Sequence, residues 1–475
     1  MQILKEKFGF DAFRPGQEAV IRDVLAKKSQ IAILPTGSGK SLCFQLPAYL
    51  LEGTVLIISP LVALMEDQVA ILKQQGEKRV AALNSFHTYP ERERILQQLS
   101  TYKFIFISPE MLTVPKVAHT IKKTRLAFIV IDEAHCISQW GFDFRPDYLR
   151  IGEFLKEIPT PSILALTATA DDKVIHDIKD TLNLNNPVFH KQSLDRPNIS
   201  YVIHEMASEE EKTAWLMKRV KETTGPGIIY VSSRKRADEL ALLIKDQVAG
   251  VASYHAGIEQ EDRTFVQAQF LSGELEWICA TNAFGMGIHK DDVRQVIHEH
   301  IPSTIANYIQ EVGRAGRDGQ LSIATLIYTP EDIRKAKFMV QEDLPQEEEV
   351  RYFAHSLAER KTFQEAATLA GVGETGKRIL QYYLERLSVE ETIRKIDTQR
   401  HKKETELQKM VEFIGRETCI RESILRFFGE ALQERPPICC AACHPINPES
   451  LQLMKHLSES RKWGDWSIRL TQLLG

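Results

Sequence analysis

The stretch "QIAILPTGSGKSLCFQLPAYLL" (30–51) predicts a strand, a glycine-rich loop and a helix in direct succession. Its first part, "QIAILP" (30–35), has the length of a buried strand, and the part after the glycines has a helical pattern. Gly37 and Gly39 allow the backbone amides of the loop to turn toward phosphate oxygens, and the N-terminus of the helix adds its dipole. The stretch therefore predicts a phosphate-binding loop of the P-loop type.

The same loop carries side chains that are suited to a nucleotide. Lys40 has the reach to contact the β- and γ-phosphates, and Ser41 is expected to bind magnesium. Leu34 stands where a P-loop usually has its first glycine. The alternative is a glycine-rich turn with a surface lysine, which the strand–loop–helix context disfavours. The expected nucleotide contacts of the loop are Thr36, Gly37, Ser38, Gly39, Lys40 and Ser41.

The apolar runs of the chain extend this unit into two α/β domains. The chain has 475 residues, which is too many for one compact core. Runs rich in Val, Ile and Phe with little alternation are typical of parallel strands that are buried on both faces, with helices between them. They form two series, 30–35, 54–60, 103–109, 126–132 and 162–168, then 226–232, 250–256, 277–281, 295–299 and 324–329. Two series predict two doubly wound parallel-sheet domains.

The division of the chain follows from these series. The segment "SLDRPNISY" (193–201), which contains Pro197, lies between them. We place the boundary within it, so that the two domains cover residues 1–195 and 196–330. Beyond the second series the strand signals end, and amphipathic helical patterns predict a helical C-terminal region over 331–475.

Composition places the chain among ordinary globular proteins, with 43% hydrophobic and 26% charged residues. The formal net charge of −4 argues against a generally basic nucleic-acid-binding protein, although a local basic groove remains compatible with it. No apolar run approaches the roughly 18 residues of a membrane span. The first residues, "MQILKEKFGF" (1–10), lack the apolar core of a signal peptide. We therefore expect a cytoplasmic protein that does not enter membranes.

Two acids follow the strand expected at 126–132. In a P-loop NTPase an aspartate in the place of Asp132 holds magnesium, often through water, and an acid such as Glu133 positions or deprotonates the attacking water. The alternative is two solvated acids at the start of a helix. That reading is improbable here, because the lysine-bearing loop precedes them in the same series of strands.

A pair of arginines follows in the second series, in "QEVGRAGRDG" (310–319). Arg314 and Arg317 are flanked by glycines, and guanidinium groups in such a place can reach the γ-phosphate from a neighbouring domain. The alternative is a basic turn that binds a surface carboxylate. We favour arginine fingers, because a two-domain ATPase needs a positive charge delivered across its cleft.

Eight segments together resemble the RecQ helicases of superfamily 2, most closely the short bacterial RecS-type members. The segments are "FGFDAFRPGQ" (8–17), "LPTGSGKSLCFQLPA" (34–48), "ISPLVALMEDQ" (58–68), "DEAHCISQWGFDFRPDY" (132–148), "LTATA" (166–170), "YHAG" (254–257), "ATNAFGMGIHK" (280–290) and "QEVGRAGRDG". The resemblance implies two tandem RecA-like domains that hydrolyse ATP with Mg²⁺ in a DNA-stimulated way. It further implies 3′→5′ translocation on single-stranded DNA and unwinding of duplexes, in DNA repair, recombination and replication maintenance.

The resemblance also assigns roles around the nucleotide. Gln17 matches the glutamine that reads the edge of adenine, and Arg14 lies beside it on the base. His135, Thr167 and Gln310 match positions that couple the state of the nucleotide to the cleft between the domains. Each of these three is equally readable as a satisfied polar residue at a domain interface.

DNA contacts are implied in two sets. The segment after Glu133 matches an aromatic-rich loop that contacts single-stranded DNA, and stacking on such rings contributes about 1–3 kcal/mol per base. Trp140, Phe142 and Arg145 are the expected sensors in it, whereas Phe144 is as readily a packing residue. Contacts to the phosphate backbone are expected from residues at strand ends, where a turn or helix cap is the alternative. They are Ser59, Ser108, Ser232, Arg234 and Thr281.

Four of the seven cysteines lie near the C-terminus, and the family carries a four-cysteine zinc site there. In "PPICCAACHP", Cys440 and Cys443 keep the family's spacing, while Pro437 stands where an earlier cysteine is expected. Cys439 is the expected substitute, and His444 is a further candidate ligand. The expected ligands of zinc are Cys419, Cys439, Cys440 and Cys443. Free thiols are the alternative, and Cys43, Cys136 and Cys279 are expected to be buried thiols.

Two further expectations concern the C-terminal region. The segment "TFQEAATLAGVGETGKRILQYYLERL" (362–387) predicts two helices joined by a tight turn, as a helix-turn-helix or as a plain helical hairpin. About 30 residues follow Cys443, which we expect to be too few for a winged helix or a further accessory domain.

The expected partners are single-stranded and tailed or forked duplex DNA, with single-strand-binding protein and repair factors as candidates, and we expect a monomer associated with the nucleoid. An RNA helicase is the nearest rival enzyme, and an ATP-gated DNA-binding or remodelling module that does not unwind is a rival of another class.

Replacing Trp140 with alanine is expected to leave basal ATP hydrolysis intact and to remove its stimulation by DNA, because the indole ring is the expected stacking surface. The measurement is the ATPase rate with and without single-stranded DNA. A wild-type stimulation ratio would assign Trp140 to the packing of the protein.

Overall fold

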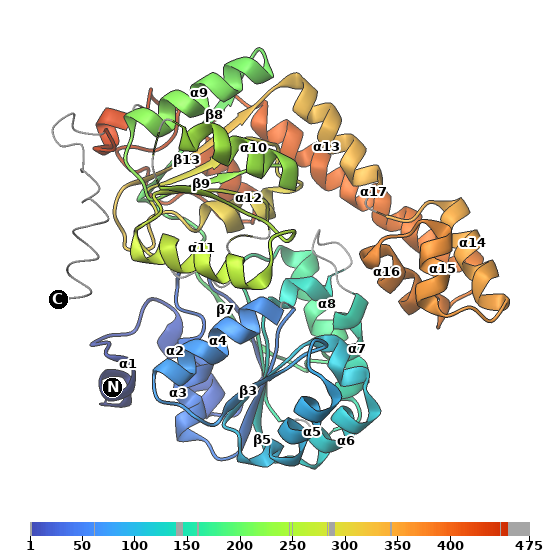
Figure 1. The fold of residues 1–475 in the computed structure, drawn as a ribbon. Coiled ribbons are helices and arrows are strands. Elements are labelled where there is room, and N and C mark those ends of the chain that lie inside the picture. Colours follow the sequence, from blue (N-terminus) through green and yellow to red (C-terminus); the bar gives the residue numbers. More distant parts are fainter. Residues whose placement is uncertain are drawn as a thin grey trace, which may run out of the picture.

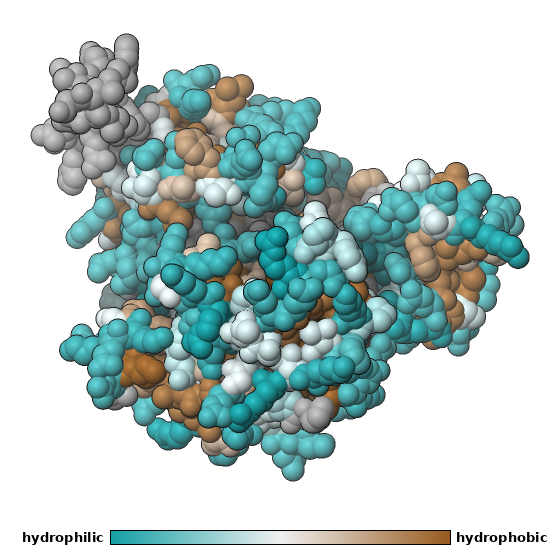
Figure 2. Space-filling view, turned by 60° about the horizontal axis from the view of Figure 1, so that its bottom comes forward, coloured by the Kyte–Doolittle hydropathy of each residue, from teal (hydrophilic) through white to brown (hydrophobic). Residues whose placement is uncertain are grey.

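The computed structural model describes residues 2–60, 62–138, 146–158, 161–246, 248, 250–282, 284, 290–342, 344–446 and 448–454. Two sheet domains lie one above the other in Figure 1, and a helical unit projects from their side. The same unit stands out at the side of the space-filling view (Figure 2). Among the described helices, none has the length and hydropathy that a membrane crossing requires.

The first domain is a seven-stranded parallel sheet in the order β3-β4-β2-β5-β6-β1-β7. Its strands are β1 Gln30–Ile33, β2 Thr54–Ile58, β3 Val80–Leu83, β4 Phe104–Ile107, β5 Leu126–Ile131, β6 Ile163–Thr167 and β7 Val188–Lys191. Its helices are α1 Gln2–Phe8, α2 Gln17–Leu25, α3 Leu42–Leu50, α4 Val62–Gln74, α5 Tyr89–Gln97, α6 Pro115–Lys123, α7 Pro146–Leu155 and α8 Asp172–Thr181. Apolar side chains of α2, α3 and α4 pack on one face of the sheet, and those of α6, α7 and α8 pack on the other.

The second domain repeats the plan with six parallel strands in the order β10-β11-β9-β12-β13-β8. The strands are β8 Ile199–Glu205, β9 Gly227–Tyr230, β10 Val251–Tyr254, β11 Trp277–Ala280, β12 Gln295–His298 and β13 Ser322–Tyr328. The helices are α9 Glu209–Glu222, α10 Arg234–Lys245, α11 Gln260–Ser272 and α12 Ile305–Val312. Every predicted strand is present in one of the two sheets, whereas β3, β7 and β8 were not predicted.

Helices make up most of the described C-terminal region. They are α13 Pro330–Glu342, α14 Glu347–Ala358, α15 Phe363–Ala370, α16 Glu374–Leu384, α17 Val389–Ile414 and α18 Ile420–Phe427. The unit of α14–α16 has its own apolar core with the start of α17, while the other end of α17 packs into the core of the second domain. Two doubly wound sheets and a helical C-terminal region confirm the predicted fold class.

The projecting unit touches the first domain through α16 and α7. Arg150 of α7 pairs with Glu385 at 2.9 Å, and Arg386 pairs with Glu153 at 3.3 Å. The ring of Tyr382 lies under both guanidinium groups, 5.6 Å from that of Arg150 and 4.3 Å from that of Arg386. The C-terminal region therefore bridges both sheet domains.

A buried arginine fixes α18 to the segment that joins the two sheets. The side chain of Arg421 is 1% exposed and pairs with Asp195. It also donates to the carbonyl oxygens of Arg196, at 3.0 Å, and of Ile199, and it lies over the ring of Tyr201. An arginine supplies five donors in a planar fork, so one side chain can hold three acceptors at once.

Arg421→Met is expected to lower the free energy of unfolding by about 3–5 kcal/mol, because it leaves a carboxylate and two buried carbonyls without their donor. Arg426→Met on the same helix is the matched control: that side chain is 75% exposed, and a change within about 0.5 kcal/mol is expected. Denaturant unfolding of both variants measures the difference. Equal midpoints for the two variants would show that the anchor contributes nothing to stability.

Candidate functional site

The predicted phosphate-binding loop connects β1 to α3. Gly37 and Gly39 have φ values of +84° and +76°, which is the left-handed region that glycine adopts without a steric cost. The backbone N–H of Leu34 donates to the carbonyl of Thr167 at 3.0 Å, so the loop starts beside the end of β6. Ser41 is the residue before the first turn of α3, so the loop leads into a helix N-terminus, as anion binding requires.

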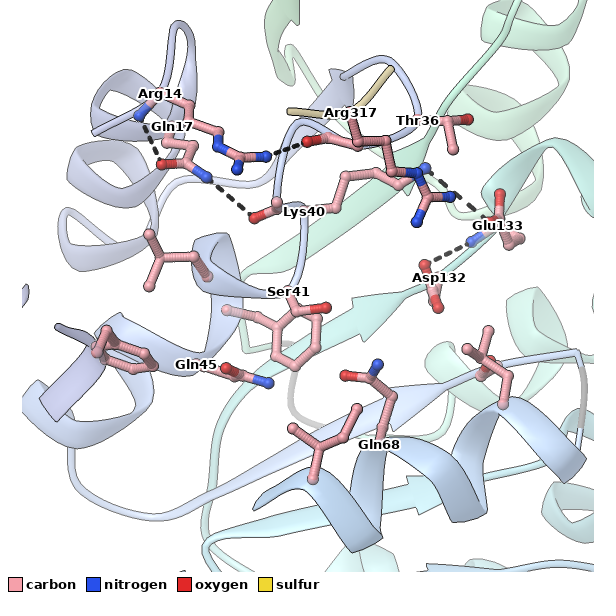
Figure 3. A pocket seen from close by; sticks show the side chains of 18 of the residues that line it. Arg14, Gln17, Thr36, Lys40, Ser41, Gln45, Gln68, Asp132, Glu133 and Arg317 are labelled. Atoms are coloured by element: carbon pink, nitrogen blue, oxygen red, sulfur yellow. Dashed lines mark hydrogen bonds and ion pairs between the residues drawn. The ribbon is translucent and has the colours of Figure 1, made fainter. Parts of the chain in front are cut away.

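Gln17 and Arg14 hold this loop from α2 and the segment before it. The side-chain amide of Gln17 donates to the carbonyls of Ser38, at 2.8 Å, and Gly39, at 3.1 Å, and its oxygen accepts from the N–H of Arg14 at 2.9 Å (Figure 3). The guanidinium of Arg14 donates to the carbonyl of Gly37. With Gln17 only 3% exposed, its amide is committed to the phosphate loop in this structure.

Asp132 and Glu133 lie at the carboxyl end of β5. The N–H of Asp132 donates to the carbonyl of Ile58, which places the acid beside the end of β2. Glu133 has a left-handed backbone with φ +46°, a conformation that costs non-glycine residues about 1–3 kcal/mol and is concentrated at functional sites. Its carboxylate lies 4.0 Å from the ammonium of Lys40. The predicted base and the predicted phosphate-binding lysine are therefore neighbours.

The surroundings of Asp132 favour a bound cation. Removal from bulk water and the neighbouring charge of Glu133 raise the pKa of Asp132 to about 6, although Lys40 opposes the shift. The donor set around it is made of oxygens, from the Asp132 carboxylate and the Ser41 hydroxyl, and both line one cavity. Hard oxygen donors suit magnesium, and a dication there would favour the ionised form of both carboxylates.

Two contacts connect the acids to the rest of the first domain. Nδ1 of His135 lies 3.0 Å from Oγ1 of Thr167, and the hydroxyl of Thr167 contacts the carbonyl of Thr169 at 3.0 Å. The hydroxyl of Tyr148, in α7, donates to the carbonyl of Asp132 at 2.9 Å. The predicted coupling residues His135 and Thr167 thus form a pair, while Gln310 lines the cavity from the second domain.

A cavity of about 500 Å³ lies between the phosphate loop, the acids and the second domain. Its lining includes Lys40 from one side and the predicted arginine fingers Arg314 and Arg317 from the other. Figure 3 shows Arg317 beside Lys40 and Glu133. Burial and the charge of Arg314 lower the pKa of Arg317 to about 10. Cationic side chains from two domains on one cavity are an arrangement for binding the phosphates of a nucleotide.

Some lining residues were not singled out by the sequence. Phe10 is 51% exposed and lines the cavity together with Arg14 and Gln17. It lies within "FGFDAFRPGQ", so its position in that segment was the only available signal. An aromatic ring beside a guanidinium and an amide is suited to a planar base.

The residues expected to contact DNA are placed differently from one another. Trp140, Phe142 and Arg145 lie outside the described residues, as does Phe144. Ser232 and Arg234 are exposed at the carboxyl end of β9, and Thr281 is partly exposed after β11. The side chains of Ser59 and Ser108 are buried, so the structure does not bring their hydroxyls to the surface with the others, and Ser59 lines the nucleotide cavity.

The four C-terminal cysteines come together despite their irregular spacing. The Sγ atom of Cys419 lies 3.7 Å from that of Cys439 and 3.8 Å from that of Cys440, and the Sγ atoms of Cys440 and Cys443 are 3.5 Å apart. Tetrahedral zinc with Zn–S bonds of about 2.3 Å separates its sulfur ligands by about 3.8 Å. All four ligand atoms lie within 4.8 Å of one another, and the group does not include His444. The residues therefore fit structural zinc.

The chemistry of these thiols also calls for a cation. Burial raises the pKa of Cys439 to about 11 and raises that of Cys443 as well. The burial of Cys440 is outweighed by hydrogen bonds from the N–H of Ile420 and from neighbouring thiols, so the pKa of Cys440 is lowered. A bound cation would favour the thiolate form of Cys439 and Cys443. The separations are far above the length of a disulfide, and every cysteine is a free thiol. Cys43, Cys136 and Cys279 are buried, as predicted.

A phosphate loop and acids in one α/β domain, faced by arginines of a second, define a two-domain P-loop ATPase of the helicase type. Three family models match the amino-acid sequence: DEAD/DEAH box helicase over residues 14–178, helicase conserved C-terminal domain over 211–319 and RecQ zinc-binding over 377–444. The last model spans all four clustered cysteines. The chain belongs to the RecQ family of ATP-dependent DNA helicases.

Known proteins support this placement. The chain is 41% identical over 452 residues to the probable ATP-dependent DNA helicase RecS of Bacillus subtilis, covering 93% of this chain and 91% of that protein. It is 41% identical over 334 residues to the ATP-dependent DNA helicase RecQ of Pasteurella multocida, covering 70% of this chain and 52% of that protein. The solved structure of the DEAD-box helicase Mss116 bound to ssRNA matches 84% of the chain and 88% of its own, with a TM-score of 0.59 and 17% identity, which shows a shared fold.

Cys443→Ser is expected to abolish stoichiometric zinc and to lower the melting temperature, because structural zinc contributes directly to folding free energy. His444→Gln is the matched control and is expected to retain zinc. Metal analysis of the purified variants and thermal unfolding with and without a chelator measure both effects. Wild-type protein without zinc, or a melting temperature that does not respond to chelation, would leave the cluster as free thiols.

Proposed function

We propose that the protein couples the hydrolysis of Mg-ATP to 3′→5′ translocation on single-stranded DNA and to the separation of duplex DNA. One observation carries the proposal: Lys40, Asp132 and Glu133 of the first domain share a cavity with Gln310, Arg314 and Arg317 of the second. A site built from two domains closes and opens as they move, which is how hydrolysis can drive movement along a strand.

The roles of the residues follow from the geometry. Lys40, in the phosphate-binding loop that follows β1, neutralises charge on the β- and γ-phosphates. Ser41 and Asp132 would hold the magnesium ion, which would neutralise further charge on the phosphates. Glu133, turned into the cavity by its left-handed backbone, orients the attacking water and accepts its proton. Arg314 and Arg317 stabilise the charge that develops on the transferred phosphoryl group.

The base of the nucleotide is expected at the other end of the cavity. Arg14 and Gln17 are the expected contacts of adenine, with Phe10 as a stacking surface. Because the amide of Gln17 also holds the carbonyls of Ser38 and Gly39, reading the base and shaping the phosphate loop depend on the same side chain. Adenine binding would thereby be coupled to the conformation of the loop.

DNA is the proposed substrate, since the relatives RecS and RecQ are named as DNA helicases. We propose that single-stranded DNA runs along the ends of strands in both domains, with Ser232, Arg234 and Thr281 as phosphate contacts. Trp140, Phe142 and Arg145 are the proposed sensors of the bound strand. The three proposed domains are residues 1–195 and 196–330, which are the two RecA-like domains, and residues 331–475, which are the helical C-terminal region. The proposed partners are tailed or forked DNA, single-strand-binding protein and repair factors, with a monomer acting at the nucleoid in the cytoplasm.

Strand displacement on a 3′-tailed DNA duplex, with a 5′-tailed duplex and a tailed RNA duplex as comparisons, tests the proposal. Unwinding of the 3′-tailed DNA alone is the expected result. Unwinding of the RNA duplex in preference would favour the rival RNA helicase. DNA-stimulated hydrolysis without displacement would favour the rival remodelling module.

Lys40→Ala is expected to lower ATP hydrolysis by at least about 100-fold, because it removes the charge that holds the phosphates, and to leave binding of single-stranded DNA near the wild-type level. Lys73→Ala, an exposed lysine of α4, is the matched control and should keep full activity. ATPase rates and fluorescence anisotropy with labelled DNA measure the two properties. Loss of DNA binding with retained hydrolysis would contradict the role of the loop.

A further inference from the structure

Three uncharged polar side chains of the nucleotide cavity make no hydrogen bond to another described residue. Gln45 of α3 is 6% exposed, Gln68 of α4 is 7% exposed and Ser59, after β2, is 1% exposed, and all three line the cavity. Within the described part of the chain, neither side-chain amide makes a hydrogen bond to another residue. The hydroxyl of Ser59 is fully buried and has no partner there either. Buried polar groups in folded proteins are almost always satisfied by protein or by ordered water. Polar groups that face the cavity without a protein partner are therefore available to what the cavity binds.

The cluster lies next to the expected magnesium ligands. The N–H of Gln45 donates to the carbonyl of Ser41 at 2.9 Å, so Gln45 is one helical turn further along the same face of α3. Ser59 follows Ile58, whose carbonyl accepts from the N–H of Asp132. Figure 3 shows the amides of Gln45 and Gln68 extending toward each other in the part of the cavity next to Ser41 and Asp132.

The rest of this part of the cavity is apolar. Leu42, Phe44, Met65 and Phe106 line it and offer no hydrogen-bonding groups. A hydrogen bond that a buried polar group fails to make costs about 1–3 kcal/mol, so amides that face the cavity without a protein partner are stabilised by a donor bound there. A small, strongly polar species between them removes this cost.

We propose that Gln45 and Gln68 are positioning residues for the cation, whose bound water molecules donate hydrogen bonds to their side-chain oxygens. The inference rests on the proposed Mg-ATP site. Magnesium keeps several of its waters when it binds to one or two protein ligands and phosphates, and each such water has hydrogens to donate. Amides accept these bonds without adding a third negative charge beside Asp132 and Glu133. The hydroxyl of Ser59 provides a further acceptor in the same shell.

The test measures cation binding rather than activity. Mn²⁺ binding is followed by EPR in the presence of AMP-PNP for the wild type, Gln45→Leu and Gln68→Leu. Each substitution is expected to weaken Mn²⁺ binding by about tenfold, the lower end of the effect of outer-shell ligands on metal affinity. Binding of AMP-PNP without the cation should be unchanged. Gln75→Leu is the matched control, because Gln75 lines the same cavity but is exposed. This variant is expected to bind Mn²⁺ with the affinity of the wild type.

Folding does not obscure this result. Leucine has a similar volume and replaces an amide that makes no hydrogen bond within the described part of the chain, so the melting temperatures of both variants are expected to stay close to that of the wild type. Unchanged Mn²⁺ affinity in both variants would overturn the proposal and leave the Mg-ATP site itself standing. Wild-type protein that fails to bind Mn²⁺ with AMP-PNP would instead contradict the proposed function.

Discussion

Parallel pairing of the strands in both sheets is the constraint on which the site depends. In a parallel sheet all carboxyl ends meet at one edge, and ligands of open α/β sheets bind there. The order β5-β6-β1 brings three of these ends together. The acids follow β5, Thr167 ends β6 and the phosphate loop follows β1. The pairing of these strands is therefore enough to bring residues that are far apart in sequence next to one another.

The residues at this edge could be predicted from the sequence because they lie in short segments whose residue types are each required by phosphate or metal binding. The unpredicted strands show where that logic ends. β3 reads "VAAL", which has little strand propensity, and β7 reads "VFHK" at a partly exposed edge. Hydrogen-bond satisfaction is likewise invisible in sequence: nothing in the pattern marks Gln45 or Gln68, because their lack of partners is a property of the packed cavity.

The cysteine cluster shows a second limit of prediction from sequence: cysteine spacing does not reveal how a loop folds its side chains together. Spacing alone left Cys439 as a substitute for the residue at Pro437, two positions earlier, because spacing does not show how the loop between them turns. In the structure the backbone at 439–443 turns tightly, with the N–H of Cys443 donating to the carbonyl of Cys440, and an isolated bridge between Tyr201 and Cys440 holds the loop against β8. The turn brings adjacent cysteines to one centre, and the bridge joins the cluster to the second domain.

These contacts connect the C-terminal region to both sheet domains. It is fixed to the second domain by α17 and the cysteine loop, and to the connecting segment by Arg421. Its only described ion pairs with the first domain's helix α7 are made by Glu385 and Arg386, which directly follow α16, and partly exposed pairs of this kind contribute about 0.2–1 kcal/mol each. Relative movement of the sheet domains must therefore either carry α7 along or break these weak pairs. The same helix holds the carbonyl of Asp132 through the hydroxyl of Tyr148, two residues before Arg150. The ion pair of Arg150 with the C-terminal region and the contact with Asp132 therefore lie within one turn of α7.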